Sequence, residues 1–411
     1  MTPEIKQRIE QIRRGEVPEG YQRTFLGIAP KSWDKSRIDK ICRLSSGSTP
    51  RRDAVENFAG DILWVTSGEL KRRTIEDTRE KISETAVVNS HLEIYDPGTV
   101  VIAIYGLEAA GIRGTVSIIG KQCTISQACM AFTEFKGIDN EFFYYWYLNN
   151  GQVIGLRYAQ GTKQQNLSTD IVGSFPICFP SQGEQQKIAA ILTTQDKVIE
   201  LKEKRLAEKQ RQKKYLMQQL LTGKKRLPGF SGAWEQEKLG YICDIVKGEQ
   251  VNKNSLYEVG KYYVLNGGVT PSGYTDIWNT SENTISISEG GNSCGFVNFN
   301  REKFWSSGHC YTLNSLNSSK IVNTFLYQYL KHHEYEIKSM RVGSGLPNIQ
   351  KNALDNFSLT CPPIEEQTAI AEVLSTADRE IELLQQDIEQ EKQKKKALMQ
   401  LLLTGIVRVK T

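Results

Sequence analysis

The sequence predicts an α+β protein with an internal pseudo-two-fold repeat, in which two long antiparallel coiled-coil helices separate two mixed α/β globular blocks. Three observations predict this fold: a duplicated helical segment, opposite charges on its two copies, and two globular blocks that share landmarks but otherwise differ. The duplication decides how every other segment is interpreted.

The duplicated segment occupies residues 184–223 and again residues 366–405, at a constant offset of 182 positions. About half of the aligned positions are identical. Neither copy contains Pro or Gly before its last residue, and Ala, Leu, Glu, Lys and Gln dominate, which favours a helix. Gly223 and Gly405 stand where a glycine that ends a helix belongs.

Each predicted helix carries a seam that repeats at steps of four and three residues for about five heptads, which is typical of a coiled coil. At 1.5 Å per residue such a helix is roughly 55–60 Å long. In the first copy the seam includes Lys202, Lys209 and Lys213. These lysines predict a weakened middle, with room for a further helix from a partner.

The charges of the two copies indicate which helices pair. Residues 181–222 contain nine basic and five acidic residues, a net charge of +4. Residues 363–404 contain five basic and nine acidic residues, a net charge of −4. A charge run is often only a solvated helix face, but opposite charges on duplicated helices favour pairing of each with the other.

Composition places the chain among globular proteins. It has 411 residues, of which 39% are hydrophobic and 24% charged, enough for two or three domains with cores of their own. No apolar run approaches the twenty or so residues of a membrane span, and the first residues lack the apolar region of a signal peptide. A cytoplasmic protein without membrane contact is expected. The net charge of +5 permits nucleic-acid binding without requiring it.

The eight cysteines are scattered without a CxxC pair, so core thiols are expected rather than zinc sites or disulfides. The histidines lack a constellation of carboxylates or thiols that would suggest a metal site. We therefore expect no metal.

Five segments follow along the chain: an N-terminal helix and linker (1–30), a first block (31–180), the first long helix (181–223), a linker with a second block (224–361), and the second long helix with a tail (362–411). The blocks open alike, from Trp33 to Gly47 and from Trp234 to Gly248. They also end alike, with GTKQQNL (161–167) and GSGLPNI (343–349).

Between these landmarks the blocks diverge, and each is expected to mix strands and helices. Apolar runs predict strands at 62–66, 99–104, 115–119, 129–132, 262–265, 284–288, 295–298 and 311–313. Apolar-aromatic segments predict helices at 140–150 and 323–331, in addition to a short one within 1–15. Two variable blocks on a repeated scaffold suggest a protein that reads two different features a fixed distance apart.

The helix starts EQQKIAAIL and EQTAIAEVL, the helix ends LMQQLLTG and LMQLLLTG, and the block openings WDKSRIDKICRLSSGSTPR and WEQEKLGYICDIVKGE together resemble the specificity (S) subunit of type I restriction-modification enzymes. The G-[ST]-x-x-x-N-[LI] sites before both long helices add to this resemblance, which covers nearly the whole chain.

The resemblance implies a non-catalytic subunit with two target-recognition domains, each reading one half of a bipartite site in double-stranded DNA. The helices would act as a spacer and as the dock for two methyltransferase (M) subunits, and restriction (R) subunits would join the full complex. No cofactor is expected on this chain, because S-adenosylmethionine, ATP and Mg would be bound by the partner subunits.

The residues agree with a chain that has no catalytic residues of its own. There is no G-x-x-x-x-G-K-[ST] phosphate loop and no N-P-P-Y or D-P-P-Y motif of an amino-methyltransferase. A self-contained methyltransferase or nuclease is therefore disfavoured. The remaining alternative is a coiled-coil scaffold for protein interactions whose blocks do not bind DNA in a sequence-specific way.

DNA contacts require Lys and Arg for phosphates, and Arg, Lys, Asn, Gln, Ser or Thr on projecting loops for base edges. Although any single surface residue is more often only solvated, the loops supply a defined set. In the first block the candidates are Thr49, Arg51, Arg52, Lys71, Arg72, Arg73, Arg113, Lys163 and Gln164, with 71–73 the first choice for phosphate. In the second block they are Asn266, Ser272, Tyr274, Asn292, Ser307, His309, Arg341, Ser344 and Asn348.

The expected docking positions for the methyltransferase lie at both ends of the helix seams. They are Ile188, Leu192, Leu216, Leu220, Ile370, Leu374, Leu398 and Leu402.

Overall fold

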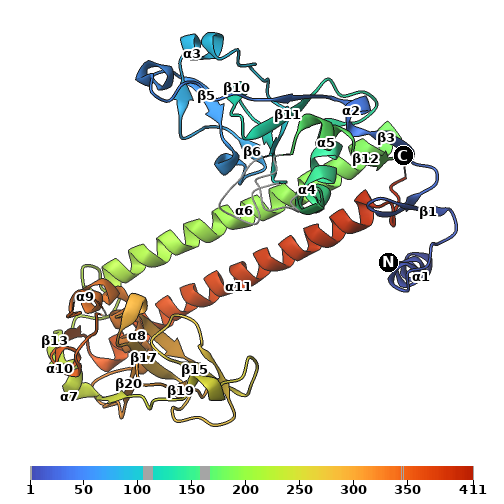
Figure 1. Ribbon diagram of the computed structural model, residues 1–411. Coiled ribbons are helices and arrows are strands. Elements are labelled where there is room, and N and C mark those ends of the chain that lie inside the picture. Colours follow the sequence, from blue (N-terminus) through green and yellow to red (C-terminus); the bar gives the residue numbers. More distant parts are fainter. Residues whose placement is uncertain (1, 105–113, 158–166, 344, 346, 411) are drawn as a thin grey trace. The chain divides into compact units, whose positions relative to one another are not determined.

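The structure is a computed structural model that describes residues 2–104, 114–157, 167–343, 345 and 347–410. The chain divides into two compact units, Met1–Leu201 with Ile388–Thr411, and Lys202–Asp387. Each unit combines one globular block with one half of each long helix, α6 (Gln182–Leu220) and α11 (Ile364–Leu403) (Figure 1).

The first unit contains two larger sheets, one small hairpin and one strand pair. Its five-stranded sheet has the order β4-β11-β8-β9-β6, and its three-stranded sheet has the order β10-β5-β7. Besides the two half-helices, its elements are α1 (Pro3–Arg13), β1 (Tyr21–Thr24), β2 (Gly27–Pro30), β3 (Asp34–Arg37), α2 (Ile38–Ile41), β4 (Arg43–Ser46), η1 (Val55–Phe58), β5 (Ile62–Val65), η2 (Ser67–Glu69), β6 (Thr74–Ile75), β7 (Lys81–Ile82), α3 (Glu84–Asn89), β8 (Val100–Ala103), β9 (Val116–Ile119), β10 (Cys123–Ile125), β11 (Cys129–Thr133), α4 (Asn140–Arg157), α5 (Thr169–Gly173) and β12 (Pro176–Phe179).

The second unit repeats this plan. Its four-stranded sheet has the order β14-β20-β17-β18, and its three-stranded sheet has the order β16-β15-β19. Its elements are β13 (Glu235–Lys238), α7 (Leu239–Ile242), β14 (Asp244–Lys247), η3 (Lys253–Ser255), β15 (Tyr262–Leu265), β16 (Gly273–Thr275), β17 (Thr284–Ser288), η4 (Gly291–Ser293), β18 (Val297–Asn300), β19 (Trp305–Ser306), β20 (Cys310–Asn314), α8 (Asn323–His332), α9 (Glu334–Ser339), α10 (Lys351–Asp355) and β21 (Ser358–Cys361).

The predicted α+β repeat is confirmed, and the structure extends it into the block interiors. In chain order the strands of β4-β11-β8-β9 correspond to those of β14-β20-β17-β18, although the sequences between the shared landmarks diverge. In both blocks the opening and closing strands also pair antiparallel, β3 with β12 and β13 with β21.

The two glycines that open the blocks have the same structural role. A Cβ atom on Gly47 would lie 2.0 Å from the carbonyl oxygen of Ile125, and one on Gly248 would lie 2.4 Å from that of Ser306. Since real Cβ atoms do not approach a backbone oxygen so closely, only glycine fits either position. The shared Trp-to-Gly opening therefore reflects a common packing of the first strands.

Some expectations about local structure need correction. The linker within residues 1–30 contains the β1–β2 hairpin, with Tyr21 opposite Pro30. The strand expected at 295–298 is β18, which begins two residues later because Gly295, with φ +82°, lies in a turn. The helix expected at 140–150 continues to Arg157.

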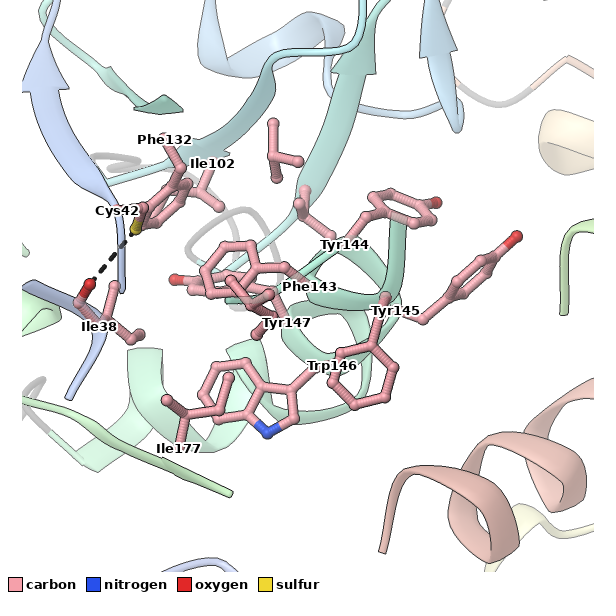
Figure 2. Close-up of a cluster of buried hydrophobic side chains, with 14 of the residues drawn as sticks. Ile38, Cys42, Ile102, Phe132, Phe143, Tyr144, Tyr145, Trp146, Tyr147 and Ile177 are labelled. Atoms are coloured by element: carbon pink, nitrogen blue, oxygen red, sulfur yellow. Dashed lines mark hydrogen bonds between the residues drawn. The ribbon is translucent and has the colours of Figure 1, made fainter. Parts of the chain in front are cut away.

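Each block packs its core against the long helices of its own unit. In the first unit the aromatic residues of α4, from Phe142 to Tyr147, are buried among strands β8 and β11, and Figure 2 shows part of this cluster. The same core includes Ile188 and Leu192 of α6 and Leu402 of α11. In the second unit Leu220, Ile370 and Leu374 belong to the core of the second block. Burial of apolar area therefore holds block and helices together.

The half-helices are antiparallel, and the charged seam explains their pairing in the second unit. Lys202 lies 2.7 Å from Asp387, Lys209 lies 2.6 Å from Glu380, and Lys213 forms an ion pair with Asp378. The predicted weakening of the helix pair at the three seam lysines is therefore wrong, because each lysine bonds across the pair. Opposite charges between the duplicated helices were the correct indication.

Candidate nucleic-acid interface and helix surfaces

The basic residues of the first block fall into exposed and internally bonded groups. Lys71 and Arg72 are exposed, and neither has an ion-pair partner among the described residues. Thr49 is half-buried, and Arg51, whose side chain is 82% exposed, pairs only with its neighbour Asp53 at 2.8 Å. These four remain available for contacts with a polyanion.

Arg52 is held more firmly than a free surface cation. It forms an ion pair of 2.5 Å with Glu80, and its guanidinium lies 4.6 Å from the centre of the Phe58 ring and 5.1 Å from that of Trp64. Its side chain is still 56% exposed. Packing of this kind orients the guanidinium and reduces the entropy lost on binding a phosphate.

Arg73 does not contact solvent in the way that the predicted phosphate contact requires. Its guanidinium is ion-paired with Glu141 of α4, lies 3.8 Å from Asp196 of α6, and sits over the Tyr144 ring. Its side chain is only 28% exposed. We therefore correct this assignment: Arg73 links the first block to α6, and the basic loop offers Lys71 and Arg72 instead.

In the second block, the predicted residue His309 lies beside a buried carboxylate, that of Glu289. Its Oε1 accepts bonds from Lys247 Nζ at 2.5 Å and Tyr311 Oη at 3.3 Å, while its Oε2 lies 3.6 Å from His309 Nδ1. Lys247 and His309 are 52% and 60% exposed. The carboxylate thus binds the exposed Lys247 directly, and the exposed His309 lies beside it. We call Glu289, Lys247 and His309 the Glu289 cluster.

Two further loops reach this cluster. Asn348 bridges to Gly290, and Ile349 N donates to the Glu289 carbonyl at 2.8 Å. A Cβ on Gly267, next to Asn266, would lie 2.9 Å from the His309 carbonyl oxygen. The structure therefore brings Asn266, Asn348 and His309 together, with Asn292 exposed in η4 beside them. Sequence analysis missed Glu289 because a single acid after an apolar strand carries no motif.

Three buried polar atoms of this region lack a hydrogen-bond partner among the described residues: Asn266 Oδ1, Glu289 Oε2 and Ser307 Oγ. Such atoms are uncommon in folded proteins and indicate a site whose polar groups are not all satisfied internally. Ser307 itself is fully buried, so the predicted contact of its side chain with DNA is corrected: it lies beneath the surface.

The remaining candidates are three residues of the second block and four residues that lie outside the described part of the chain. Ser272 is exposed, and Tyr274 pairs with Tyr263 in the β15–β16 hairpin. Arg341 is exposed after α9. Arg113, Lys163, Gln164 and Ser344 lie outside the residues that the structure describes.

The apolar docking positions expected on the helices lie inside the units. Ile188, Leu192, Ile370 and Leu374 are at most 1% exposed, and Leu220 and Leu402 are at most 4% exposed. Leu216 and Leu398 are half-buried and pack against the same cores. Side chains that are buried in the core of their own unit cannot form a surface for a partner subunit, so this prediction is wrong.

Other apolar residues of the long helices do face outward. In the first unit Ile191 is 39% and Leu201 66% exposed, and in the second unit Tyr215 is 56% and Leu383 58% exposed. Leu201 and Leu383 are equivalent in the repeat, 182 positions apart, and identical. Their equivalence could have identified them, because they lie off the heptad seam and yet are leucine in both copies.

One polar position that is identical in the two helices, Gln185 and Gln367, is bonded to the block in each unit. Gln185 Nε2 donates to the Pro180 and Gly137 carbonyls at 2.8 and 3.1 Å, and its Oε1 accepts from Asp139 N at 2.7 Å. Its equivalent Gln367 bonds to Pro362, Lys320 and Val322 N in the same way, at 2.9 Å each. Each amide fixes the loop before α4 or α8 to the start of a long helix.

The acids next to these glutamines are also matched. Glu184 binds Arg408 of the tail at 2.6 Å, and Glu366 binds Arg226 of the linker at 2.5 Å. Arg226 and Arg408 are 182 positions apart. Both carboxylates are buried, so each needs its arginine to offset the cost of desolvation. The linker and the tail therefore close the two units by the same contact.

Metal-ligating side chains are scattered rather than clustered in the described part of the chain. No group of three or more His, Cys, Asp and Glu side chains within it could hold a metal ion. Of the cysteines, seven are buried and Cys178 is half-buried, which confirms core thiols, and burial raises the pKa of Cys42 to about 12. None of the helices in the described part of the chain is long and apolar enough to cross a membrane.

Comparison with solved structures shows the same fold. The crystal structure of the S subunit of a type I restriction-modification system from M. genitalium superposes with a TM-score of 0.65 and 17% identity, over 92% of this chain and 97% of that one. A structure from work on complex assembly and conformational transition of the type I system superposes with a TM-score of 0.56 and 17% identity, over 92% and 99%.

Curated relatives are named as specificity subunits. A putative type I specificity subunit of Mycoplasma pneumoniae is 36% identical over 38% of this chain and 42% of its own length, so the match spans about two fifths of that relative. The MjaVIII specificity subunit of Methanocaldococcus jannaschii is 24% identical over 93% of this chain and 94% of its own length.

The family model described as "Type I restriction modification DNA specificity domain" matches residues 30–210 and 232–393. Those two matches cover both blocks and most of both long helices. The chain belongs to the family of type I restriction-modification DNA specificity proteins.

Proposed function

We propose that this chain is the non-catalytic DNA-recognition subunit of a type I restriction-modification complex, in which each block reads one half of a bipartite target in double-stranded DNA. The observation that carries the proposal is the contrast within the repeat. The blocks share strand order and attachment to the helices, while their outer loops differ in chemistry. A repeated scaffold with two different reading surfaces is what an asymmetric bipartite site requires.

The two surfaces suit different kinds of contact. Lys71 and Arg72 of the first block are exposed cations on a loop, suited to phosphates. In the second block Lys247, His309, Asn266 and Asn348 are gathered around Glu289 and supply donors and acceptors suited to base edges. The phosphate contacts would position the protein on the DNA, and the base contacts would select the sequence.

We further propose that two methyltransferase subunits dock on the outward apolar residues Ile191, Leu201, Tyr215 and Leu383 rather than on the seam. Exposed leucines at equivalent positions offer each methyltransferase copy the same anchor. Leu201→Ala and Leu383→Ala should weaken capture of the methyltransferase while leaving the unfolding midpoint unchanged. The exposed Gln210→Ala is a matched control, and full capture by the double leucine variant would remove this docking site.

Chemistry then resides in the partners. The methyltransferase would supply S-adenosylmethionine, and restriction subunits would supply ATP and Mg. The contribution of this chain is to hold a chosen adenine where the methyltransferase can reach it.

The test is co-expression with the methyltransferase subunit in a host without adenine methylation, followed by genome-wide mapping of methylated adenine. One motif of two short half-sites with a fixed gap is the expected result. An active, bound methyltransferase that marks no such motif would contradict the proposal and favour the scaffold for protein interactions.

A further inference from the structure

Two aspartates, Asp196 and Asp378, occupy the same position in the two long helices, 182 residues apart. Each lies three helical turns beyond the glutamine that fixes its block, Gln185 or Gln367. The spacing of eleven residues corresponds to roughly 16 Å along the helix. A second attachment at that distance prevents a block from pivoting about the first one.

In the first unit Asp196 joins three elements. Its Oδ1 binds Lys395 of α11 at 2.6 Å, and its Oδ2 accepts the hydroxyl proton of Tyr145 of α4 at 2.7 Å. The Tyr145 hydroxyl also lies 3.1 Å from Thr193 Oγ1. Burial raises the pKa of Tyr145, so the hydroxyl stays protonated and donates. Asp196 and Lys395 are only 18% and 17% exposed.

In the second unit Asp378 makes the equivalent contacts with different residues. Its Oδ1 binds Lys213 of α6, and its Oδ2 accepts from Gln328 Nε2 of α8 at 2.6 Å. Lys213 and Lys395 are themselves 182 positions apart. Gln328 is 1% exposed and follows the same plan as Tyr145, with the donor on the block's own helix. The acid and the lysine are thus repeated, while the donor from the block is not.

These contacts differ from an ordinary helix-pair ion bridge because the block takes part. Either carboxylate binds a lysine of the opposite long helix and a donor of a globular block, so the block is fixed to both helices at one point. Asp196 also lies 3.8 Å from Arg73 of its block. Partly buried carboxylates with two bonded partners have little orientational freedom. Losing one such bond releases the block without removing its apolar core.

We propose that Asp196 and Asp378 are positioning residues that set the orientation of each recognition block on the helix pair, and thereby the selectivity for the gap between the two half-sites. This inference rests on the proposed function. Helix length then defines the approximate gap. The contacts of Asp196 and of Asp378, which we call the two junctions, disfavour DNA targets whose gap differs from the preferred one by one base pair.

The test uses the full chain in complex with its methyltransferase and a set of duplexes that carry the mapped half-sites with gaps changed by one or two base pairs. Asp196→Asn, Asp378→Asn and the milder Tyr145→Phe are compared with the control Glu208→Gln, an exposed acid of α6 that binds only Arg211 and Gln212 of its own helix. The readout is the methylation rate on each gap and the base preference within each half-site.

We expect each junction variant to lose about tenfold of its discrimination against duplexes whose gap differs by one base pair from the mapped one. The base preference within each half-site should stay unchanged, and the control should keep the wild-type profile. A purely structural role would lower all rates together and leave the profile unchanged. Thermal unfolding identifies a variant that no longer folds, and Tyr145→Phe, which removes one oxygen atom, then carries the test.

Folded variants with the wild-type gap profile would overturn the inference, and so would folded variants that fail on every gap, because the aspartates would then act on binding itself. A wild-type complex that shows no bipartite site at all would instead overturn the proposed function. The two failures are therefore distinguishable.

Discussion

In both units an aspartate of one long helix is paired with a lysine of the other, but the two recognition blocks bind these aspartates through different side chains. Block one presents Tyr145 and the neighbouring Arg73 to Asp196, whereas block two presents the neutral amide of Gln328 to Asp378. The difference shows that the helix side of the junction is repeated, while the block side varies with the block. Exchange of blocks between such chains would therefore require a compatible donor, not an identical one.

The largest effects on stability are expected when equivalent core side chains are removed from the two units, and they compare how well the two cores are packed. Leu192→Ala and Leu374→Ala remove matched, fully buried side chains, one from each core. Each should lower the free energy of unfolding by about 2–5 kcal/mol, the range for a leucine removed from a packed core. Denaturant unfolding measures both values. A loss below about 1 kcal/mol at either site would show that the two halves are not equally packed.

Exchanging the charges should distinguish the two junctions. Lys213→Asp with Asp378→Lys should recover most of the stability lost by either single change. Gln328 Oε1 has no hydrogen-bond partner among the described residues, so it can accept from a lysine once the amide turns. Lys395→Asp with Asp196→Lys should stay about 1.5–3 kcal/mol less stable, because the new lysine faces Arg73, whose Nε lies 3.8 Å from Asp196. Double-mutant cycles measure both, and equal recovery would refute the assigned role of Arg73.

The reading surfaces should differ in what they control. Glu289→Gln keeps the side-chain size but removes the charge that binds Lys247 and lies beside His309. We expect discrimination to change by about 1–3 kcal/mol at one base pair of one half-site, with the other half-site unchanged. Methylation mapping checks this, with the exposed Glu282→Gln as control. Unaltered preference in both half-sites would remove the cluster from base reading.

The smallest effect concerns phosphate contacts of the first block. Lys71→Ala or Arg72→Ala should weaken binding uniformly across sequences and reduce the slope of log affinity against log salt by about one. Arg73→Ala should lower the unfolding midpoint instead, because Arg73 is bonded within the unit. Salt titrations with Arg14→Ala as control provide the comparison. An unchanged slope in both loop variants would place the phosphate contacts elsewhere.

Local patterns predicted more of the fold than of the site. The strands at 262–265 and 284–288 and the start of α8 at residue 323 agree with the structure, because alternating or continuous apolar runs decide them locally. The junction residues were recognisable only as identical positions in a repeat. Whether Arg73 faces solvent or Asp196 depends on α4 and α6, which are distant in sequence, so no local pattern decides it.

The sequence by itself determined the duplication, the two long helices, their opposite charges and the family. The reason is that periodicity, charge and repeated segments follow from the order of residues alone, without knowledge of their contacts. The tertiary structure alone decided that the seam leucines are internal, that Leu201 and Leu383 face outward, and that Glu289 gathers the polar side chains of the second block. The physical reason is that burial and hydrogen bonding are satisfied between elements far apart in the sequence, by whichever side chain folding brings within reach.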